Sequence, residues 1–451
     1  MNRKRIWGWW FFDWAGQPYH TLLVSFIFSI YYADVARRFY ILQGYDAAQA
    51  GAMAQTLWGY GLAISGAIIA ILAPVLGAVA DSTGRRMPWV WFFSGAVIVG
   101  AAGLWWLTPD NPNLIAAVAF FGLGLIGIEF ATIFTNAMLP GLAPRDEIGR
   151  VSGAGFAFGY LGGLVALAIM LLFFAESESG QTLLEIAPLF GLDPAQSEGT
   201  RFVGPFTALW YAVFMIPFFM WVREPATTGQ RFSVTATMTG LWRLIAGLRH
   251  RPSLGAWLVS SMLSRDALNA LYGFGGVYAG TVLGWSVTMS GIFGIVSVIA
   301  AALISWLGGH ADRRWGPKPV VIVAIIALSA VCVLIIGMER RALFGIALAP
   351  GSKLPDALFF LCGALIGGAG GAMQAASRTL TARHTSEARA TEVFGLYALS
   401  GKATAFLAPF LIATVTAATG NQRLGIAPLI VMFLLAIWLL RWVNKNGETE
   451  Q

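Results

Sequence analysis

The sequence predicts an all-α polytopic membrane protein, with twelve transmembrane helices in two pseudo-symmetric six-helix bundles. Of its 451 residues 57% are hydrophobic and only 11% are charged, whereas soluble domains carry roughly 25% charged residues. Long segments, among them residues 47–80 and 267–311, contain no Asp, Glu, Lys or Arg, and about 20 such residues cross a bilayer as a helix. A loop motif also recurs half a chain apart, which indicates a duplicated unit.

Hydropathy and helix-breaking residues place the spans in order along the chain. The first follows Arg3, Lys4 and Arg5 without a small-residue cleavage site, so we expect it to remain as a helix. Charged loops such as Arg85–Arg86 and Arg313–Arg314 separate later spans. The twelve spans are expected near residues 12–34, 55–80, 88–107, 114–139, 150–174, 204–222, 254–282, 286–308, 318–338, 356–382, 391–416 and 424–442.

An even number of spans puts both termini on the same side of the membrane. Most of the 29 Lys and Arg residues fall in the loops on that side, and the positive-inside rule makes it the cytoplasmic side. We therefore expect a multi-pass protein of the plasma (inner) membrane with both termini in the cytoplasm. The same rule explains the net charge of +7 without nucleic acid as a partner.

Two long loops divide this pattern. Residues 1–222 are expected to form an N-terminal six-helix bundle, residues 223–253 a cytoplasmic linker, and residues 254–451 a C-terminal six-helix bundle. Within the linker, apolar residues at helical spacing beside Arg243 and Arg249 predict an amphipathic helix on the bilayer surface, with a regulatory docking site as the alternative. The outer loop 176–199 is expected to be a solvated cap. The apolar linker residues are Met238, Leu241, Trp242, Ile245 and Leu248.

The recurring motif lies between spans two and three and again between spans eight and nine. The first copy is Gly77-x-x-x-Asp81-Ser82-Thr83-Gly84-Arg85-Arg86, and the second begins Gly308-x-x-x-Asp312-Arg313-Arg314. Glycine lets helices approach closely, and an aspartate can accept hydrogen bonds from a neighbouring helix N-terminus. This signature resembles that of the major facilitator superfamily, and the resemblance covers nearly the whole chain. It departs from the pattern at Ser82, where a base is usual, and by one extra residue before Gly316.

Two further segments resemble the autophagy-related vacuole effluxer-like branch of that superfamily. They are Gly8-Trp9-Trp10-Phe11-Phe12-Asp13-Trp14-Ala15 and residues 394–405, FGLYALSGKATA. The resemblance implies a transporter that alternates between two open states, and it implies a gating role for Asp81, Arg85, Arg86, Asp312 and Arg313. Fungal members of the branch are linked to amino-acid efflux, which makes an amino acid or short peptide the expected solute.

Polar stripes run along four of the expected spans. A charged group at bilayer depth is costly unless it faces a partner or a cavity, so each is a candidate for function. The spans are one, four, seven and ten, which line the central cavity in the resembled superfamily. The stripes are Asp13, Gln17 and His20; Glu129, Thr132 and Asn136; Arg265, Asn269 and Tyr272, with Asp266 beside them; and Gln374, Arg378 and Thr381.

The charges of these stripes differ between the halves. The first half holds the acidic Asp13 and Glu129, and the second holds an excess of bases that includes Lys402 on span eleven. Two interpretations stay open. The charges form ion pairs that close the cavity, or they bind a solute ammonium near Glu129 and its carboxylate near Arg265 or Lys402. Alternating access can use both by exchanging partners.

Depth along the helices separates the candidates. Asp13 and Arg378 lie near cytoplasmic ends, where gate pairing is expected, while Arg265 and Lys402 lie close to the bilayer midplane. Burial favours a protonated carboxyl group, so we expect proton coupling through Glu129 or Asp266, with His20 as either a titrating or a hydrogen-bonding residue. The expected solute and proton pathway comprises His20, Glu129, Asn136, Arg265, Asp266, Asn269, Tyr272 and Lys402.

Other functions find little support in the chain. Gly122-x-Gly124-x-x-Gly127 matches a dinucleotide motif but lies inside a span, where close helix packing explains it. Cys332 and Cys362 lie in apolar spans, so neither a disulfide nor a metal site is expected. We expect a monomeric protein without cofactors that is not an enzyme and whose partners are a small-molecule solute, protons and the lipid bilayer. A facilitator of sugars or lipid-like solutes, with Trp14, Tyr19, Trp257 and Tyr272 as stacking residues, is the alternative, as is a receptor or channel.

Overall fold

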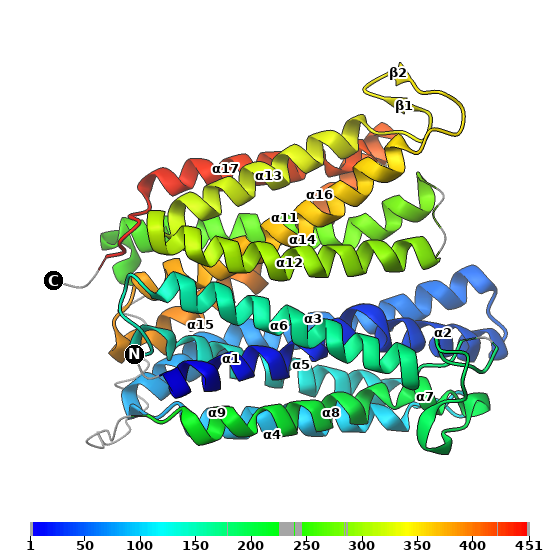
Figure 1. Ribbon diagram of the computed structural model, residues 1–451, viewed down its shortest axis with the longest axis horizontal. Helices are drawn as coiled ribbons and strands as arrows, with labels where there is room; N and C mark the ends of the chain where they lie inside the picture. The colour runs from blue at the N-terminus through cyan, green and yellow to red at the C-terminus, as the bar shows by residue number, and fades with distance from the viewer. Residues whose placement is uncertain are drawn as a thin grey trace.

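The computed structural model describes residues 3–448, apart from residues 178, 225–238, 240–245, 284, 286 and 422. Within these residues, ten helices are long and apolar enough to cross a membrane. The two other expected spans are also helical. One is the segment 3–42, which a π-helix interrupts, and the other is α11, which carries Arg265 and Asp266. The fold is therefore the expected bundle of twelve transmembrane segments (Figure 1).

The first bundle is built from helices that match the first six expected spans. The first span extends further at both ends than hydropathy indicated, from Arg3 to Leu42. The helices are α1 (Arg3–Pro18), the π-helix η1 (Tyr19–Phe26), α2 (Phe28–Leu42), α3 (Ala47–Thr83), α4 (Met87–Gly103), η2 (Leu104–Trp106), α5 (Leu114–Asn136), η3 (Leu139–Gly141), α6 (Ile148–Phe173), η4 (Leu189–Gly191), η5 (Pro194–Gln196), α7 (Glu198–Arg201), α8 (Val203–Phe214) and α9 (Ile216–Trp221).

The second bundle repeats this order and adds a small β-hairpin between α13 and α14. Its helices are η6 (Leu248–His250), α11 (Pro252–Thr281), α12 (Val287–Trp315), α13 (Pro317–Gly337), α14 (Leu354–Arg383), η7 (Glu387–Arg389), α15 (Ala390–Ala403), α16 (Leu407–Thr419), η8 (Leu424–Ile426), α17 (Ala427–Leu439) and η9 (Leu440–Trp442). The strands β1 (Ala342–Leu343) and β2 (Ile346–Ala347) pair antiparallel. Phe344 and Gly345 between them both have positive φ, as a tight hairpin turn requires.

Two transmembrane segments are discontinuous. Pro18 lies inside the first, and because proline has no N–H, a regular α-helical hydrogen bond is lost there and the chain continues as a π-helix. The eleventh expected span is broken between α15 and α16, where Thr404 has a non-helical conformation. Hydropathy predicted one continuous helix in each case, because neither break changes the apolar character of the span.

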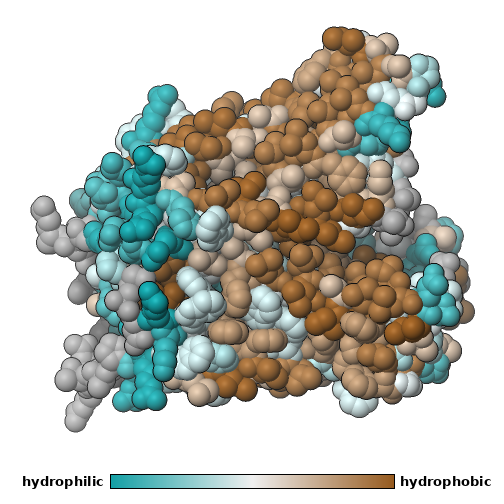
Figure 2. Space-filling model, in the orientation of Figure 1, coloured by the Kyte–Doolittle hydropathy of each residue, from teal (hydrophilic) through white to brown (hydrophobic). Residues whose placement is uncertain are grey.

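Both termini and most charged groups gather at one end of the molecule, which we call the terminal face. Figure 1 places the two chain ends there, and in Figure 2 hydrophilic residues cluster at that end beside a broad hydrophobic belt. Large apolar side chains such as Ile115 and Phe92 are exposed on the belt, as a lipid-facing surface requires. The part of the amphipathic linker pattern between Met238 and Ile245 lies outside the described residues.

Two glutamates that follow the last helices of the bundles cap other helices at the terminal face. The Glu224 carboxylate accepts hydrogen bonds from the backbone N–H groups of Arg86 and Met87, at 2.7 and 2.9 Å, where α4 begins. The Glu448 carboxylate accepts from Ser253 at 3.1 Å, where α11 begins. A negative charge at a helix N-terminus satisfies free N–H groups and the helix dipole, so each chain segment ties its own bundle together at this face.

Candidate functional site

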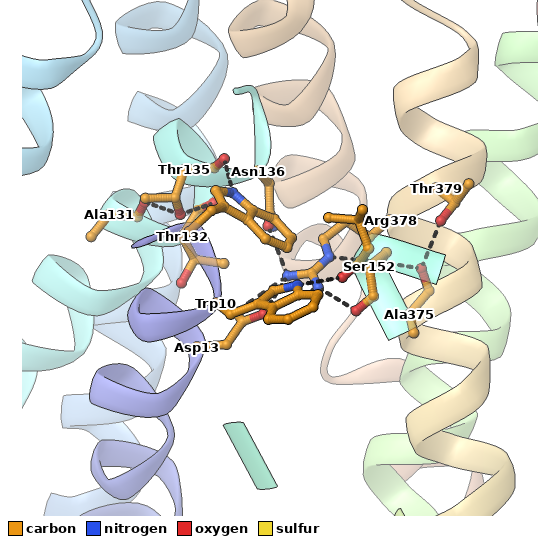
Figure 3. A network of polar contacts seen from close by, with 12 residues as sticks. Trp10, Asp13, Ala131, Thr132, Thr135, Asn136, Ser152, Ala375, Arg378 and Thr379 are labelled. Atoms are coloured by element: carbon orange, nitrogen blue, oxygen red, sulfur yellow. Dashed lines mark hydrogen bonds and ion pairs between the residues drawn. The ribbon is translucent and has the colours of Figure 1, made fainter. Parts of the chain in front are cut away.

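A buried arginine near the terminal face is one of the points where the two bundles meet (Figure 3). Arg378 on α14 of the second bundle is 3% exposed, and its guanidinium lies 3.1 Å from the carboxylate of Asp13 on α1. It also donates to the Ser152 hydroxyl and carbonyl on α6, at 2.9 and 2.8 Å, and to the Asn136 amide oxygen at 3.2 Å. Three helices of the first bundle thus hold one cation of the second.

Aromatic rings complete the surroundings of Arg378. The guanidinium carbon lies 4.4 Å from the ring centroid of Trp9 and 4.3 Å from that of Phe156. Both distances are typical of cation–π contacts, which favour a desolvated arginine. The Asp13–Arg378 cluster, defined by these two residues with Ser152 and Asn136, therefore closes the space between the bundles. Asn136, which the sequence grouped with the solute pathway, belongs to this cluster in the structure.

The first loop motif docks on the opposite bundle. The Asp81 carboxylate lies 2.8 Å from the Arg86 guanidinium and accepts from the backbone N–H of Glu392, at 2.7 Å, where α15 begins. Arg86 also donates to the Thr391 hydroxyl at 2.6 Å. A Cβ on Gly77 would lie 2.6 Å from the Thr391 carbonyl oxygen, so glycine allows this approach. Arg85 is exposed.

The second loop motif docks on the first bundle in a corresponding way. Asp312 is 1% exposed, and a Cβ on Gly149, at the start of α6, would collide with its carboxyl group. Arg383 lies 3.6 Å from the Asp312 carboxylate. Arg313 lies 2.6 Å from the carboxylate of Glu147 in the first bundle. Each bundle therefore places its motif against a helix start in the other bundle, and all these contacts lie toward the terminal face.

A second ion pair joins the bundles deeper in the protein. The ammonium of Lys402 on α15 lies 3.0 Å from the carboxylate of Glu129 on α5, and the two side chains are 25% and 23% exposed. Lys402 follows the start of α15 by twelve residues, about 18 Å along a helix, which puts it close to the middle of a bilayer. His20 lies within electrostatic range of both groups.

This pair lies beside the two breaks in the transmembrane helices. His20 belongs to the π-helix of the first segment, and Lys402 is the next-to-last residue of α15, just before the break at Thr404. Interrupted helices at the membrane midplane expose backbone polar groups and often form solute sites in transporters. The geometry therefore concentrates charge, irregular backbone and partial exposure at one place, which we call the central site: His20, Glu129 and Lys402 with their neighbours Arg265 and Asp266.

Arg265 and Asp266 take different partners, as adjacent residues on a helix must. Arg265 donates to the Tyr397 carbonyl at 2.9 Å and its guanidinium carbon lies 4.3 Å from the Tyr397 ring centroid. Within the described residues, no carboxylate lies within ion-pair distance of it. The Thr404 hydroxyl donates to one oxygen of Asp266, while the other oxygen is buried without a hydrogen-bond partner in the described part of the chain.

The rest of the α11 stripe extends from the central site. Asn269 is exposed, and Tyr272 is 41% exposed. A Cβ on Gly370 would collide with the Tyr272 hydroxyl, so Tyr272 packs against α14. The Gln374 amide of α14 lies 3.4 Å from the hydroxyl of Tyr160 in the first bundle. The stripe on α11 therefore begins at Arg265, which contacts Tyr397, and ends at Tyr272, which contacts α14, with Asn269 between them.

Most of the aromatic residues considered for sugar stacking are engaged elsewhere. The Tyr19 hydroxyl donates to the Phe121 carbonyl at 2.6 Å, and the Trp257 indole donates to the Thr381 hydroxyl at 2.9 Å. Trp14 packs against Phe158, with ring centroids 4.5 Å apart. Tyr272 is the exposed member of the set. This arrangement leaves charge, rather than aromatic faces, as the main feature of the central site.

Sequence reasoning selected the uncharged Asn136 but missed Ser152 in the Asp13–Arg378 cluster, and Tyr397 and Thr404 beside the central site. Ser152 lies in Gly149-Arg150-Val151-Ser152-Gly153, a glycine-rich stretch that indicates close packing but not a hydrogen bond to arginine. Tyr397 and Thr404 flank Lys402 in the 394–405 segment, so the resemblance at that segment was the signal that pointed to them. Within the described residues, no group of three or more His, Cys, Asp or Glu side chains could hold a metal ion.

Comparison with known proteins identifies the family. The family model described as "Vacuole effluxer Atg22 like" matches residues 1–451. The chain belongs to this family. It is a membrane transporter of the major facilitator superfamily.

Relatives and solved structures agree with that assignment. The chain is 26% identical to the uncharacterized MFS-type transporter YxiO of Bacillus subtilis over 447 residues, which cover 98% of this chain and 95% of YxiO. It is 25% identical to autophagy-related protein 22-2 of Aspergillus oryzae over 67% of this chain and 51% of the fungal protein, so it spans about half of that relative. The human organic anion transporter MFSD10 is 16% identical over 97% of this chain and 99% of MFSD10, with a TM-score of 0.71, which shows the shared fold.

Proposed function

We propose that this transporter moves a small polar or zwitterionic solute, an amino acid or short peptide, by secondary active transport coupled to protons. The observation that carries the proposal is the Glu129–Lys402 ion pair, which joins the two bundles at 3.0 Å beside two interrupted helices. The pair is partly exposed, unlike the Asp13–Arg378 pair. A solute with one ammonium and one carboxylate can replace each partner of such a pair, which gives a zwitterion a direct path into the site.

Charge placement supports this solute class. Glu129 offers a carboxylate to an ammonium group, and Lys402 offers an ammonium to a carboxylate. Arg265 lies on the next helix with no carboxylate partner within the described residues, so it can bind the same solute carboxylate with its planar donors. A neutral sugar that separated Glu129 from Lys402 would offer neither of them a counter-charge at bilayer depth, which is costly.

The interface between the bundles supports an alternating-access cycle. The Asp13–Arg378 cluster and both loop motifs hold the bundles together toward the terminal face. These contacts favour a state that is closed on that face, which we propose is the cytoplasmic side of the plasma membrane, and open on the other. Rocking of one bundle would break the contacts and open the central site to the cytoplasm.

Proton coupling is proposed for Glu129 or Asp266. Protonation of Glu129 would release Lys402, and a solute could then compete for it. Among the residues that the structure describes, one oxygen of Asp266 has no partner, and the other is bound to Thr404 at the break before α16. A proton on Asp266 would therefore change the contact that connects α11 with the interrupted eleventh span.

Transport by reconstituted protein tests the proposal. Proteoliposomes are loaded at neutral pH, and uptake of labelled L-amino acids, a dipeptide and a hexose is measured with and without an acidic exterior. We expect amino-acid or dipeptide uptake that rises with the gradient. Glu129→Gln should lower it at least tenfold, because a charge-assisted hydrogen bond is worth about 1.5–3 kcal/mol.

Counterflow exchange separates the two carboxylates. A variant of the proton carrier should lose gradient-driven uptake but keep exchange, whereas a variant of a solute-binding group should lose both. Asp266→Asn is compared with Glu129→Gln for this reason. Glu339→Gln, which removes a carboxylate that pairs with Arg423 outside the bundle, is the matched control. If neither the pH gradient nor either substitution changes the uptake, the proposed proton coupling is wrong. If the protein takes up only the hexose, the solute is a sugar and not a zwitterion.

A further inference from the structure

A second pocket lies far from the central site. It occupies about 450 Å³ between α2 and α3, close to the turn that joins these helices at residues 43–46 and away from the terminal face. Small-molecule sites have volumes of about 300–1,000 Å³. Tyr32 in its wall follows His20 by twelve residues along the first segment, about 18 Å for a helix. The pocket is therefore separate from the Glu129–Lys402 pair.

The two helices leave room for a ligand because small side chains face each other across the pocket. Gly51 and Ala54 of α3 and Ala33 of α2 line it. Trp58 of α3 also lines it, and its ring is held by Tyr32 and Phe121, with centroids 4.9 and 4.3 Å away. The pocket thus has a fixed aromatic wall next to open space.

Polar groups of both signs surround this space. Asp34 and Arg37 line it with side chains that are 41% and 54% exposed. Their closest approach is 4.0 Å, whereas Asp34 binds Arg38 at 2.8 Å. The Arg37 guanidinium therefore keeps donors for another partner. Tyr32 is 1% exposed, and its hydroxyl has no hydrogen-bond partner in the described part of the chain.

We propose that this pocket is an outer binding subsite for a zwitterionic solute with an apolar side chain. The solute carboxylate binds Arg37, its ammonium binds Asp34, and its side chain packs against Trp58. The assignment of the solute class rests on the proposed function, because the pocket lies on the side away from the terminal face, where the transported solute would arrive.

Mutations in the pocket and mutations in the central site should affect transport differently. Loss of the central site stops movement of the solute, whereas loss of an outer subsite leaves the path intact and reduces capture. Arg37→Gln should therefore raise the apparent KM for uptake of L-leucine or L-phenylalanine about tenfold, the effect of one charge-assisted hydrogen bond, and leave the maximal rate close to that of the unmodified protein. Arg341→Gln, an exposed arginine of the outer hairpin, is the matched control.

Equilibrium binding of labelled L-phenylalanine to the purified full-length protein tests the subsite directly. We expect two components in the unmodified protein. Lys402→Met should remove one, and Arg37→Gln the other. A single component that Lys402→Met abolishes would overturn the outer subsite and leave the proposed function standing. A component that Arg37→Gln abolishes, in a protein that takes up no amino acid, would overturn the proposed function and leave the outer site.

A zwitterionic lipid headgroup shares the chemistry of the proposed solute, so the lipid is varied as well. Binding is repeated in nanodiscs that contain phosphatidylcholine alone and in nanodiscs that also contain phosphatidylethanolamine. Amino-acid binding that is unchanged between the two supports the free solute. Absence of amino-acid binding in both preparations, or binding only of phosphatidylethanolamine, would overturn the assignment.

Discussion

Closure of the terminal face depends on whether Arg378 finds partners for its charge and its donors. A buried guanidinium is tolerated only when its donors and its charge are satisfied. Asp13, Ser152 and Asn136 supply these partners, and all three belong to the opposite bundle. When the bundles separate at this face, the arginine loses every one of these contacts but gains water. Arg378 is therefore stable in either state, while its partners decide which state is preferred.

Removing the carboxylate of Asp13 should shift this preference. Asp13→Asn leaves Arg378 without a counter-charge in the closed state, a loss of about 3–5 kcal/mol for a buried pair, so the terminal face should open. The change is measured by thiol labelling of Ala375→Cys, a position that is 2% exposed in the closed state, in a background where Cys332 and Cys362 are replaced by alanine. We expect labelling to rise at least tenfold.

Asp356→Asn is the control for that experiment. Asp356 forms an ion pair with Arg340 at 2.6 Å at the other end of the bundle. Its substitution therefore removes an ion pair but leaves the contacts between the two bundles unchanged. Equal labelling in the Asp13 and Asp356 variants would show that the Asp13–Arg378 pair does not hold the face closed.

At the residue scale, charge is what made the sites predictable. Asp13, Glu129, Arg378 and Lys402 were recognisable because ionised groups inside apolar spans need an explanation. Their pairing across the bundles was open, since a sequence does not tell which helices face each other. Ser152 gave no such signal, because a hydroxyl group can satisfy itself on its own helix.

At the element scale, hydropathy locates the transmembrane spans but does not show where a helix is interrupted. The span expected at residues 12–34 contains Pro18 and a π-helix, and the span expected at residues 391–416 breaks after Ala403. Both segments are predominantly apolar despite Asp13, His20 and Lys402, so span counting succeeds. The polar stripe Asp13–Gln17–His20 assumed a regular helix, but His20 lies in the π-helix that begins at Tyr19. Asp13 pairs with Arg378 near the terminal face and His20 lies near Glu129 and Lys402, so one segment carries residues of both sites.

The junction of α14, α11 and the C-terminal tail contains a buried histidine that should make stability depend on pH. His384 is fully buried, the Ser253 hydroxyl lies 2.7 Å from its Nε2, and its Nδ1 lies 2.8 Å from the Leu380 carbonyl oxygen. Burial lowers the pKa of the His384 imidazole below its ordinary value of 6.5. The folded protein therefore keeps the ring neutral at a pH where the unfolded chain protonates it.

Stability from His384 should be fully present above about pH 6.5 and lost as the pH falls below that value, because protons then bind the unfolded chain preferentially. The melting temperature of the purified protein is measured at pH 7.5 and pH 5.5. We expect a smaller decrease for His384→Gln than for the unmodified protein. His310→Gln, at an exposed histidine of α12, should behave like the unmodified protein. An identical decrease in all three would exclude the His384 junction as the source.

At the scale of the whole molecule, the two bundles hold each other through reciprocal contacts. Asp81 accepts from the start of α15, and Asp312 packs against the start of α6. The duplicated motif predicted that the two loops occupy equivalent places in two repeats, but not that each would dock on the opposite bundle. The conformational state was beyond sequence reasoning, since under the proposed alternating-access cycle the same chain also forms a state in which these contacts are broken.

The distribution of charge also predicts how the whole molecule is oriented in the membrane. Arg and Lys residues gather at the terminal face, with Lys445 exposed there, while Arg341 lies exposed in the hairpin at the other end. The positive-inside rule then places Lys445 in the cytoplasm and Arg341 outside. Single cysteines, Arg341→Cys and Lys445→Cys, are introduced into the background without Cys332 and Cys362, which are buried. A membrane-impermeant maleimide should label Arg341→Cys in intact cells and Lys445→Cys only after the membrane is permeabilised. The reverse pattern would place the closed face of the structure outside the cell and reverse the direction in which the outer subsite receives its solute.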